Sequence, residues 1–377
     1  MPSPLLELIN ADALEKVAAP LEQAWTLPPN AYTDRNVFAA EAERIFAADW
    51  ICVAREEQLP EPGDYVCVDL VRQPIVLTRS HADELHALSR VCLHRAMPIA
   101  AGTGNARRFV CPYHNWTYEL DGRLRSAPMM SGATGFSIDQ CQLPQLALEV
   151  WNGFVFVNLD NQAAPLHSQL TGLTKLVGNY DFSQLRIAQT LHFDSPWNWK
   201  ILVENFMEAY HHIGIHRATF EPNFPARESS VPDNGGEPWA FLHMPGLQPE
   251  TEEGSSFAAL DAKQRADLFA AAVFPNFLFA ATNNGGVWYQ LEPHGSDAMS
   301  LRIHILLHPE IIAALSDDEM QHMAQVYQQI HSEDIEANSG PWLGLNAALT
   351  TQGRLSPFEK AIWQLNQYWL ERMGARQ

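Results

Sequence analysis

The sequence is poor in basic residues and in long apolar runs. It contains 24 lysine and arginine residues against 44 aspartate and glutamate residues, and the formal net charge of its 377 residues is −20. A chain this acidic lacks the positive surface that binds phosphates or anionic lipid, which argues against nucleic acid and membranes as partners. No apolar run approaches the roughly 18 residues that span a bilayer, and residues 1–20 do not resemble a signal peptide. We therefore expect a soluble, cytoplasmic protein.

Cysteine is also scarce, with five residues in the whole chain. An odd number in a chain of this length does not indicate a disulfide framework, and we expect reduced thiols. Cys52, Cys67 and Cys141 have no histidine at a useful spacing and are interpreted as small core residues. The other two lie close to histidines, in the segments Cys92-Leu93-His94 and Cys111-Pro112-Tyr113-His114.

The hydrophobic pattern of the first half predicts a short helix followed by strands. Residues 34–50 have helical spacing behind Asp34, a residue suited to capping a helix. Short runs rich in β-branched and aromatic residues follow, for example at 64–70 and 153–159. The dipeptide Asp121-Gly122 favours a tight hairpin turn, because glycine accepts a positive φ. We predict a helical lead-in over residues 1–44 and an all-β domain over residues 45–160.

Residues 161–377 have a mixed pattern that predicts an α+β domain. A helix is expected near 198–212, strands near 186–194, 275–292 and 299–308, and two long helices at the C-terminal end. Each of these two helices begins with a capping box, Ser316 with Glu319 and Ser356 with Glu359. Residues 221–256 are dense in proline, glycine and acidic residues, which is typical of a long loop over a site.

The two Cys/His segments predict a metal site in the β domain. Each segment offers one thiolate and one imidazole, which suits either tetrahedral zinc or an iron–sulfur cluster. The Cys-x-His spacing is unusual for zinc, and the flanking Arg95, Pro112 and Trp116 favour a Rieske centre. In that centre, one iron keeps two cysteines and the other takes two histidines. A zinc site remains the alternative.

A second set of polar residues lies in the predicted helix near 198–212. At about 100° per residue, one face of this helix carries Asn205, Glu208, His211 and His212. Such a face is ordinarily solvated, but the same helix also carries many apolar residues. His211 and His216 are five residues apart, and both can bind one metal only if the helix breaks between them, which Gly214 permits.

Two histidines and one carboxylate form the ligand set that is typical of non-haem Fe(II) oxygen chemistry. The helix that begins at Ser316 suggests the carboxylate, because Asp334 continues its apolar stripe of Met320, Met323, Tyr327 and Ile330. Glu333 lies about 100° away from that stripe. A carboxylate that faces a core is either paired or bound to metal. We therefore predict Asp334 as the third ligand, with a buried salt bridge or a helix N-cap contact as the alternatives.

These motifs resemble the terminal oxygenase component, the α subunit, of Rieske non-haem iron oxygenases. The resemblance runs from about Trp50 to Met373. It rests on CLHR (92–95), CPYHNWTYELDGRL (111–124), GFVFVNLD (153–160), NWK…EN…E-x-Y-H…H (198–216) and SED (332–334).

The resemblance implies an N-terminal Rieske [2Fe–2S] domain, a C-terminal helix-grip domain with a mononuclear iron, and a head-to-tail homotrimer. By position, the implied cluster ligands are Cys92, His94, Cys111 and His114, and the implied iron ligands are His211, His216 and Asp334. Glu208 matches a carboxylate that bridges His211 to His114 of the neighbouring subunit, and Asn205 matches a polar position beside the iron.

The sequence departs from the patterns of the family and its subgroups at four positions. Ala96 and Asn115 stand where the family usually has glycine, which leaves the detailed loop geometry in question. The bridging acid is commonly aspartate in ring-hydroxylating members, whereas Glu208 resembles the members that oxidise carnitine, glycine betaine and related methylammonium compounds. Those relatives often carry cysteine where this chain has Ala209.

The resemblance implies an oxygenase that uses O2 and electrons from a separate reductase or ferredoxin, ultimately from NAD(P)H. Its substrate would be a small organic molecule of aromatic or methylammonium type, which is hydroxylated, dihydroxylated or oxidatively demethylated. Two alternatives remain at this stage: a Rieske electron carrier without oxygenase activity, and a zinc-stabilised small-molecule-binding protein.

Overall fold

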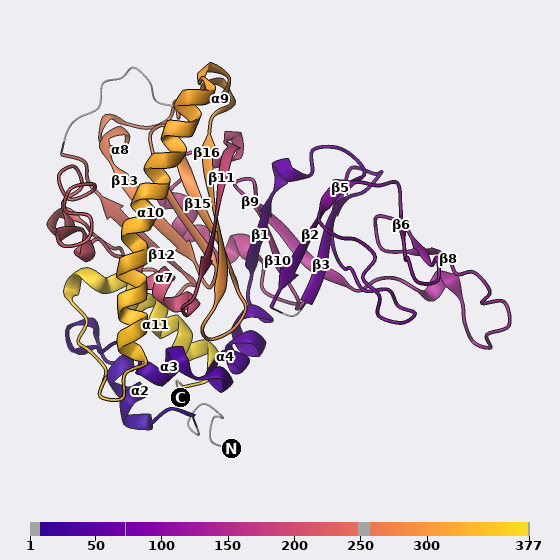
Figure 1. The fold of residues 1–377 in the computed structure, drawn as a ribbon, viewed down its shortest axis with the longest axis horizontal. Helices are drawn as coiled ribbons and strands as arrows, with labels where there is room; N and C mark the ends of the chain where they lie inside the picture. The colour runs from indigo at the N-terminus through magenta and orange to yellow at the C-terminus, as the bar shows by residue number, and fades with distance from the viewer. Residues whose placement is uncertain (1–7, 72, 248–256, 376–377) are drawn as a thin grey trace. The chain divides into compact units, whose positions relative to one another are not determined.

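The computed structural model describes residues 8–71, 73–247 and 257–375, and it divides into two compact units (Figure 1). One unit comprises Phe46–Pro165. The other combines Met1–Ile45 with Leu166–Gln377. The helical lead-in therefore belongs to the same unit as the C-terminal part of the chain. No helix in the described part of the chain is both long and apolar enough to cross a membrane.

The unit formed by residues 46–165 is an all-β domain. Its main antiparallel sheet has the strand order β1-β10-β9-β4-β3-β2-β5, and a second sheet has the order β6-β7-β8. The strands are β1 (Ile51–Arg55), β2 (Asp64–Leu70), β3 (Gln73–Arg79), β4 (Leu85–Ser89), β5 (Thr103–Asn105), β6 (Phe109–Val110), β7 (Thr117–Tyr118), β8 (Leu124–Ser126), β9 (Gln145–Trp151) and β10 (Phe154–Asn158). The predicted hairpin is confirmed, because β7 pairs with β8 and Gly122 between them has φ +89°.

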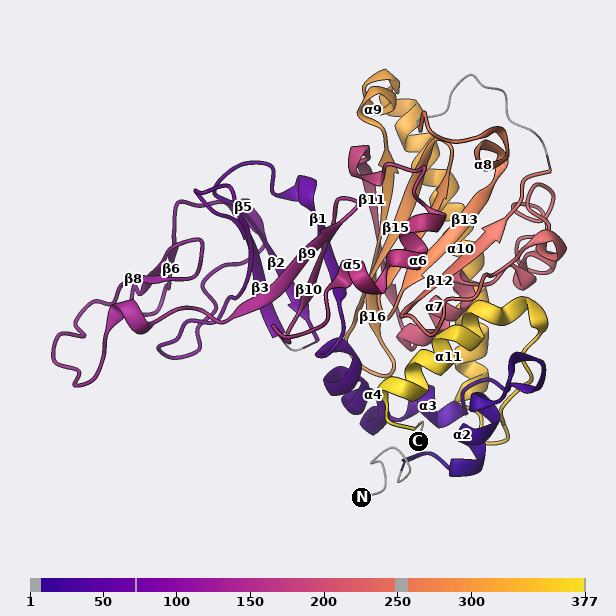
Figure 2. The ribbon, with the colours of Figure 1, turned by 180° about the vertical axis from the view of Figure 1, so that it is seen from behind.

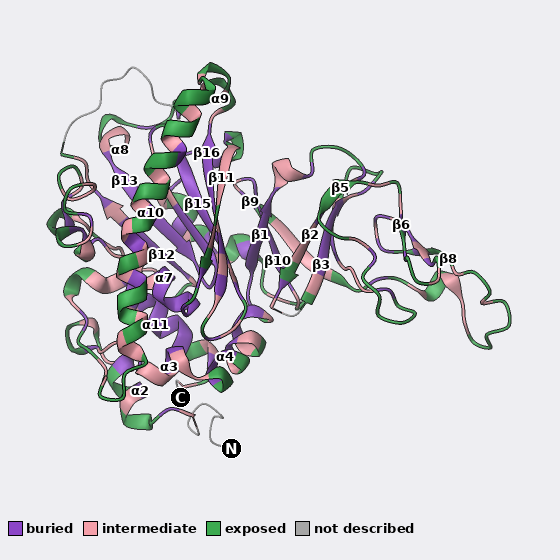
Figure 3. Ribbon diagram, viewed as in Figure 1, coloured by how far each residue is buried: buried purple, intermediate pink, exposed green. Residues whose placement is uncertain are grey.

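The larger unit is built on a six-stranded antiparallel sheet with the order β11-β16-β15-β14-β13-β12. Its strands are β11 (Arg186–Ser195), β12 (Trp239–Met244), β13 (Leu268–Val273), β14 (Phe277–Thr282), β15 (Gly285–Pro293) and β16 (Met299–Leu307). The long helix α10 (Asp317–Leu345) crosses one face of this sheet, and α6 (Thr171–Leu176) lies on the opposite face (Figures 1 and 2). Strands β12 to β16 are largely buried, whereas the edge strand β11 is mostly half-buried or exposed and the outer side of α10 is exposed (Figure 3). This arrangement confirms the predicted α+β class.

The remaining helices of this unit pack around the sheet and its ends. They are α2 (Ala11–Ala18), α3 (Pro29–Thr33), α4 (Arg35–Glu41), α5 (Leu166–Gln169), α7 (Trp199–Phe206), α8 (Ala262–Ala266), α9 (Pro309–Ala314) and α11 (Lys360–Arg372). The Asp34 cap is confirmed, since its side chain accepts a hydrogen bond from the Asn36 amide. Both predicted capping boxes, at Ser316 and Ser356, are also present.

Two predictions of local structure are wrong. The helix expected over 198–212 ends at Phe206, because the Glu208 carboxylate accepts a hydrogen bond from the His211 amide at 2.9 Å and so removes a donor from the helical pattern. The segment 221–256 is not a loop throughout, because it contains β12 at the edge of the sheet. Pairing with β13 forms this strand, and pairing between distant segments has no local sequence signal. Residues 248–256 of that segment lie outside the described residues.

Candidate metal centres

The two Cys/His segments of the β domain fold into a pair of matching loops. In the first loop, the Ala96 amide donates to the Cys92 carbonyl at 3.1 Å, and the Cys92 amide donates to the Met97 carbonyl at 2.9 Å. The second loop repeats this pattern: the Asn115 amide donates to the Cys111 carbonyl at 3.0 Å, and the Cys111 amide donates to the Trp116 carbonyl at 2.8 Å. Each loop therefore presents its cysteine and its histidine in the same way.

The four side chains of these loops fit a cluster with thiolate ligands on one side and imidazole ligands on the other. Cys92 and Cys111 are 2% and 1% exposed, whereas His94 is exposed and His114 is half-buried. The Nδ1 atoms of His94 and His114 lie 3.1 Å apart. Two nitrogens that bind one metal at about 2.1 Å each lie roughly 3 to 3.4 Å apart, which matches this distance. The predicted residues are thus brought together in a geometry that suits one iron bound by two histidines.

Neighbouring aromatic rings hold this donor set in position. Trp116 stacks on His94 with ring centroids 5.0 Å apart, and Tyr113 stacks on His114 at 3.9 Å. The buried Tyr118 hydroxyl lies 3.2 Å from the Cys92 sulfur and accepts a hydrogen bond from the Leu93 amide at 3.0 Å. The sequence did not indicate this role for Tyr118, because 26 residues separate it from Cys92.

The departures from glycine at Ala96 and Asn115 leave the two loops alike. Ala96 has φ +55° and Asn115 has φ +57°, so both adopt the left-handed conformation that glycine accepts most easily. Asparagine tolerates this conformation, whereas alanine adopts it at a cost of about 1 kcal/mol. The positive φ at these two positions explains why glycine is usual there. Alanine and asparagine adopt the same backbone conformation, so the loop geometry is kept.

His211, His216 and Asp334 converge in the larger unit. His211 lies in a short 3-10 helix over Tyr210–Ile213, His216 follows in the next turn, and Asp334 comes from α10. One Asp334 oxygen, Oδ1, lies 2.9 Å from His216 Nε2 and 3.9 Å from His211 Nε2. The three potential ligand atoms all lie within 4.8 Å of one another. This donor set and spacing fit Fe(II) with open coordination positions.

Hydrogen bonds to the opposite ring nitrogens orient both histidines. Glu208 Oε1 lies 2.6 Å from His211 Nδ1, and Glu333 Oε2 lies 2.7 Å from His216 Nδ1. Each ring therefore turns its Nε2 towards Asp334, as a metal-binding histidine requires. Asn205 donates from Nδ2 to Asp334 Oδ1 at 2.9 Å, which places it beside the same oxygen.

Glu333 is a second residue whose role the sequence did not indicate. The apolar stripe of the helix identified Asp334 as the acidic residue that faces inward, but it did not indicate which residue Glu333 contacts. The only available signal was the adjacency of two acidic residues in Ser332-Glu333-Asp334. Since 117 residues separate Glu333 from His216, the contact depends on the tertiary fold.

His212 lies on the cavity wall but not in the metal-binding group. Its Nδ1 lies 3.2 Å from the Phe224 carbonyl, to which it donates, and its ring stacks on Phe220. Burial, followed by the nearby His211, lowers the pKa of His212 to about 4, so the ring is neutral at physiological pH. Burial is the largest single effect on Asp334 and raises its pKa, but the hydrogen bonds from His216 and Asn205 and the nearby His216 and His211 rings together outweigh burial, so the net shift of the pKa is downward.

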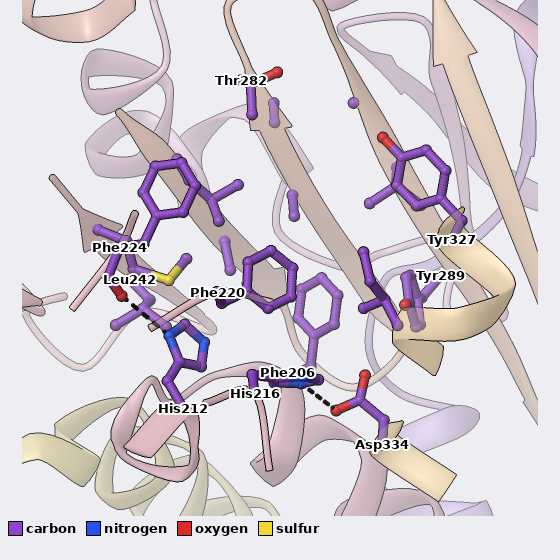
Figure 4. Close-up of a pocket in the computed structure, with 18 of the residues that line it drawn as sticks. Phe206, His212, His216, Phe220, Phe224, Leu242, Thr282, Tyr289, Tyr327 and Asp334 are labelled. Atoms are coloured by element: carbon purple, nitrogen blue, oxygen red, sulfur yellow. Dashed lines mark hydrogen bonds and ion pairs between the residues drawn. The ribbon is translucent and has the colours of Figure 1, made fainter. Parts of the chain in front are cut away.

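The candidate iron ligands lie at one end of a cavity of about 410 Å³ between α10 and the sheet. Aromatic side chains form much of its wall, including Phe206, Phe220, Phe224, Tyr289 and Tyr327 (Figure 4). The sheet side is lined by small residues, namely Ala270, Ala280, Ala281, Gly285 and Gly286. From the predicted stripe of α10, the cavity is lined by Met323, Tyr327, Ile330 and Asp334. The site therefore opens onto an apolar space large enough for a small organic molecule.

A β domain with paired Cys/His loops and an α+β domain with two histidines and a carboxylate together define a Rieske-type non-haem iron protein. Residues 49–145 match the Rieske [2Fe-2S] domain. Residues 182–375 match the ring hydroxylating alpha subunit (catalytic domain). The chain belongs to the ring-hydroxylating α-subunit family, whose two domains imply a Rieske cluster and a mononuclear iron.

Characterised relatives and solved structures agree with this family. The carnitine monooxygenase oxygenase subunit of Escherichia coli (strain K12) is 38% identical over 200 residues, which cover 52% of this chain and 54% of that protein. The matched region thus spans about half the length of that relative.

The structure of the quaternary ammonium Rieske monooxygenase CntA with an inhibitor has a TM-score of 0.82 at 24% identity, over 98% of this chain and 99% of that one. The structure of naphthalene 1,2-dioxygenase from Rhodococcus sp. has a TM-score of 0.80 at 21% identity, and the match covers 98% of this chain and 100% of that one. These two structures share the fold.

Proposed function

We propose that this chain is the terminal oxygenase component of a Rieske oxygenase that hydroxylates an N-methyl group of a small methylammonium compound. The observation that carries the proposal is the group of His211, His216 and Asp334 at the end of an aromatic-lined cavity. Iron bound there would supply O2 activation with the electrons that a separate reductase provides. The substrate class is supported by the similarity to a carnitine monooxygenase oxygenase subunit. It is also supported by Glu208, which resembles the acid of the family members that oxidise methylammonium compounds.

The residues of the cavity would position the substrate and exclude water. Asn205 would hold the Asp334 carboxylate in place through its hydrogen bond. Phe206 and Phe220 would keep the reacting carbon in an apolar environment next to the ligand group. Aromatic faces such as those of Tyr289 and Tyr327 also attract quaternary ammonium groups.

The net reaction balances with one O2, two electrons and two protons. A C–H bond of the N-methyl group becomes C–OH, and the other oxygen atom leaves as water. The C–N bond of the hydroxymethyl ammonium then breaks, its electron pair stays on nitrogen, and the hydroxyl proton passes to water. The products are formaldehyde and the demethylated amine.

Electrons would enter through a Rieske cluster held by Cys92, His94, Cys111 and His114. We propose a homotrimer, in which Glu208 joins His211 to His114 of a neighbouring copy of the chain. The 2.6 Å contact between Glu208 and His211 supports the first half of this connection. A reductase or ferredoxin is the proposed partner that supplies the electrons.

Hydroxylation of an aromatic substrate is the second candidate, because the cavity wall is largely apolar. Oxygen uptake by the purified chain with a compatible reductase distinguishes the two functions. The panel should contain methylammonium compounds and aromatic carboxylates, with formaldehyde measured in parallel. Uptake with formaldehyde release in the first group supports demethylation, whereas uptake only with aromatic compounds supports the second candidate.

Metal analysis separates the oxygenase from the remaining alternatives. The proposed enzyme contains about three irons and two acid-labile sulfides per chain and is red-brown. Stoichiometric zinc in a colourless protein would instead support a zinc-stabilised binding protein. Two irons and no mononuclear site would indicate an electron carrier.

A further inference from the structure

We infer that Glu333 is a positioning residue that fixes His216 for metal binding, and that it acts on iron retention and not on electron transfer. This inference rests on the proposed iron site. It assigns a separate role to each of the two glutamates beside the histidines.

Glu333 and Asp334 hold the same imidazole ring from opposite sides. Glu333 Oε2 lies 2.7 Å from His216 Nδ1, and Asp334 Oδ1 lies 2.9 Å from His216 Nε2. The two acids are consecutive on α10, so the position of one helix sets both contacts. The His216 side chain is only 2% exposed, so little water can replace either partner.

The Glu333 carboxylate is itself held in place. The Thr219 hydroxyl donates to Glu333 Oε2 at 2.9 Å, and the Gln329 amide donates to Oε1 at 3.4 Å. Thr219 follows His216 by three residues, and its hydroxyl lies 3.3 Å from His216 Nδ1. Glu333, Thr219 and His216 therefore form a closed group of contacts that links α10 to the turn carrying the histidine.

This group determines which nitrogen of His216 is available to a metal. A carboxylate at Nδ1 keeps the proton on that nitrogen and leaves the Nε2 lone pair directed towards Asp334. The negative charge also makes the ring a stronger donor to a metal. Without Glu333, the Thr219 hydroxyl is the remaining neighbour of Nδ1, and it provides no charge.

Glu333 and Glu208 should therefore differ in function although both contact a ring Nδ1. Glu208 is the acid proposed to join two metal centres, whereas the contacts of Glu333 among the described residues are with His216, Thr219 and Gln329. Loss of the charge at 333 should weaken metal binding and leave the rate of electron delivery to each loaded site unchanged.

The test compares Glu333→Gln with Glu336→Gln, an exposed glutamate on the same helix. The mononuclear metal is removed from each purified full-length protein, and Fe(II) affinity is measured by anaerobic competition with a chelator. We expect Glu333→Gln to bind Fe(II) about 10- to 100-fold more weakly than the wild type, and Glu336→Gln to match the wild type. The visible spectrum of the cluster and the thermal unfolding of the metal-depleted protein should not change.

A second variant and a kinetic measurement complete the test. Thr219→Val should weaken Fe(II) binding in the same direction but less, because Glu333 remains. In single turnover, re-oxidation of the reduced cluster per iron-loaded site should match the wild type in Glu333→Gln. Fe(II) affinity equal to that of the wild type would overturn the inference, and so would slow re-oxidation at full iron loading. Iron binding is measured without turnover, so an absence of oxygenase activity would contradict the proposed function and not this inference.

Discussion

Lys200 and Glu41 form a fully buried ion pair that joins the N-terminal segment to the helix leading to the iron site. Lys200 Nζ lies 2.5 Å from Glu41 Oε1, and both side chains are 0% exposed. The indole N–H groups of Trp199 and Trp369 also donate to the Glu41 carboxylate. Since Lys200 lies in α7 and Glu41 ends α4, the pair links two segments 159 residues apart.

Replacing Lys200 with Met should strongly destabilise the protein. The substitution leaves the buried Glu41 carboxylate without its positive partner, and losses of this kind cost about 3–5 kcal/mol. Equilibrium denaturation with urea measures the change. The double variant Glu41→Gln/Lys200→Met should recover part of the loss because no buried charge remains. An unfolding free energy of Lys200→Met within roughly 1 kcal/mol of the wild-type value would contradict this expectation.

Glu204 should make stability depend on pH between about 4.5 and 7. Burial raises the pKa of Glu204 to about 7, although the Tyr32 hydroxyl at 2.6 Å and the Lys200 ammonium act in the opposite direction and Glu359 adds to the rise. The folded state keeps the proton to a higher pH than the unfolded chain. The contribution of Glu204 to stability is therefore present below the unfolded pKa and is lost as the pH rises towards 7.

The variant Glu204→Gln tests this pH dependence. Glutamine keeps an acceptor for Tyr32 but does not titrate, so the decline in unfolding free energy from about pH 5 to 7 should become smaller. At about 1.4 kcal/mol per pKa unit, the difference is at most about 3 kcal/mol. Urea denaturation at several pH values gives the comparison, with Glu336→Gln as the control. Parallel curves for Glu204→Gln and the wild type would show that the pKa of Glu204 is the same in the folded and unfolded states.

Alanine at His211, His216 or Asp334 should remove the mononuclear iron and leave the cluster intact. The two donor sets lie in different compact units, so loss of one does not remove the ligands of the other. Iron should fall from about three to about two per chain, with an unchanged visible spectrum and no product. Glu336→Ala is the suitable control, because Glu333 contacts His216. Retention of full iron and activity by Asp334→Ala would refute the ligand assignment.

The variant Glu208→Gln should distinguish metal binding from electron transfer between the two metal sites. The carboxylate accepts from both the amide and the ring of His211, and in the proposed trimer it also serves His114 of a neighbouring subunit. An amide of similar shape has one acceptor oxygen and no charge, so it cannot serve both rings equally. We expect a folded protein with both metals whose reduced cluster is re-oxidised far more slowly. Normal single-turnover kinetics would show that electrons take another path.

Local sequence was sufficient wherever a structure depends on neighbouring residues. The Asp34 cap and the capping boxes at Ser316 and Ser356 involve contacts within three residues, and the Asp121-Gly122 hairpin pairs residues at most nine positions apart. All four predictions are confirmed. The types of donor in the two metal sites were also visible in the sequence, because thiolates, imidazoles and carboxylates at these spacings have few other uses.

Tertiary structure decided where those donors point and what holds them. The helix over 198–212 was predicted too long because the Glu208 side chain, which also contacts the His211 ring, takes an amide from the helical pattern. Strand β12 exists through its pairing with β13, which no local pattern indicates. The contact of Glu333 with His216 joins residues 117 positions apart, and helical periodicity describes only the faces of one helix. Contacts between distant segments depend on how the whole chain packs, so the sequence names the ligands whereas the fold orients them.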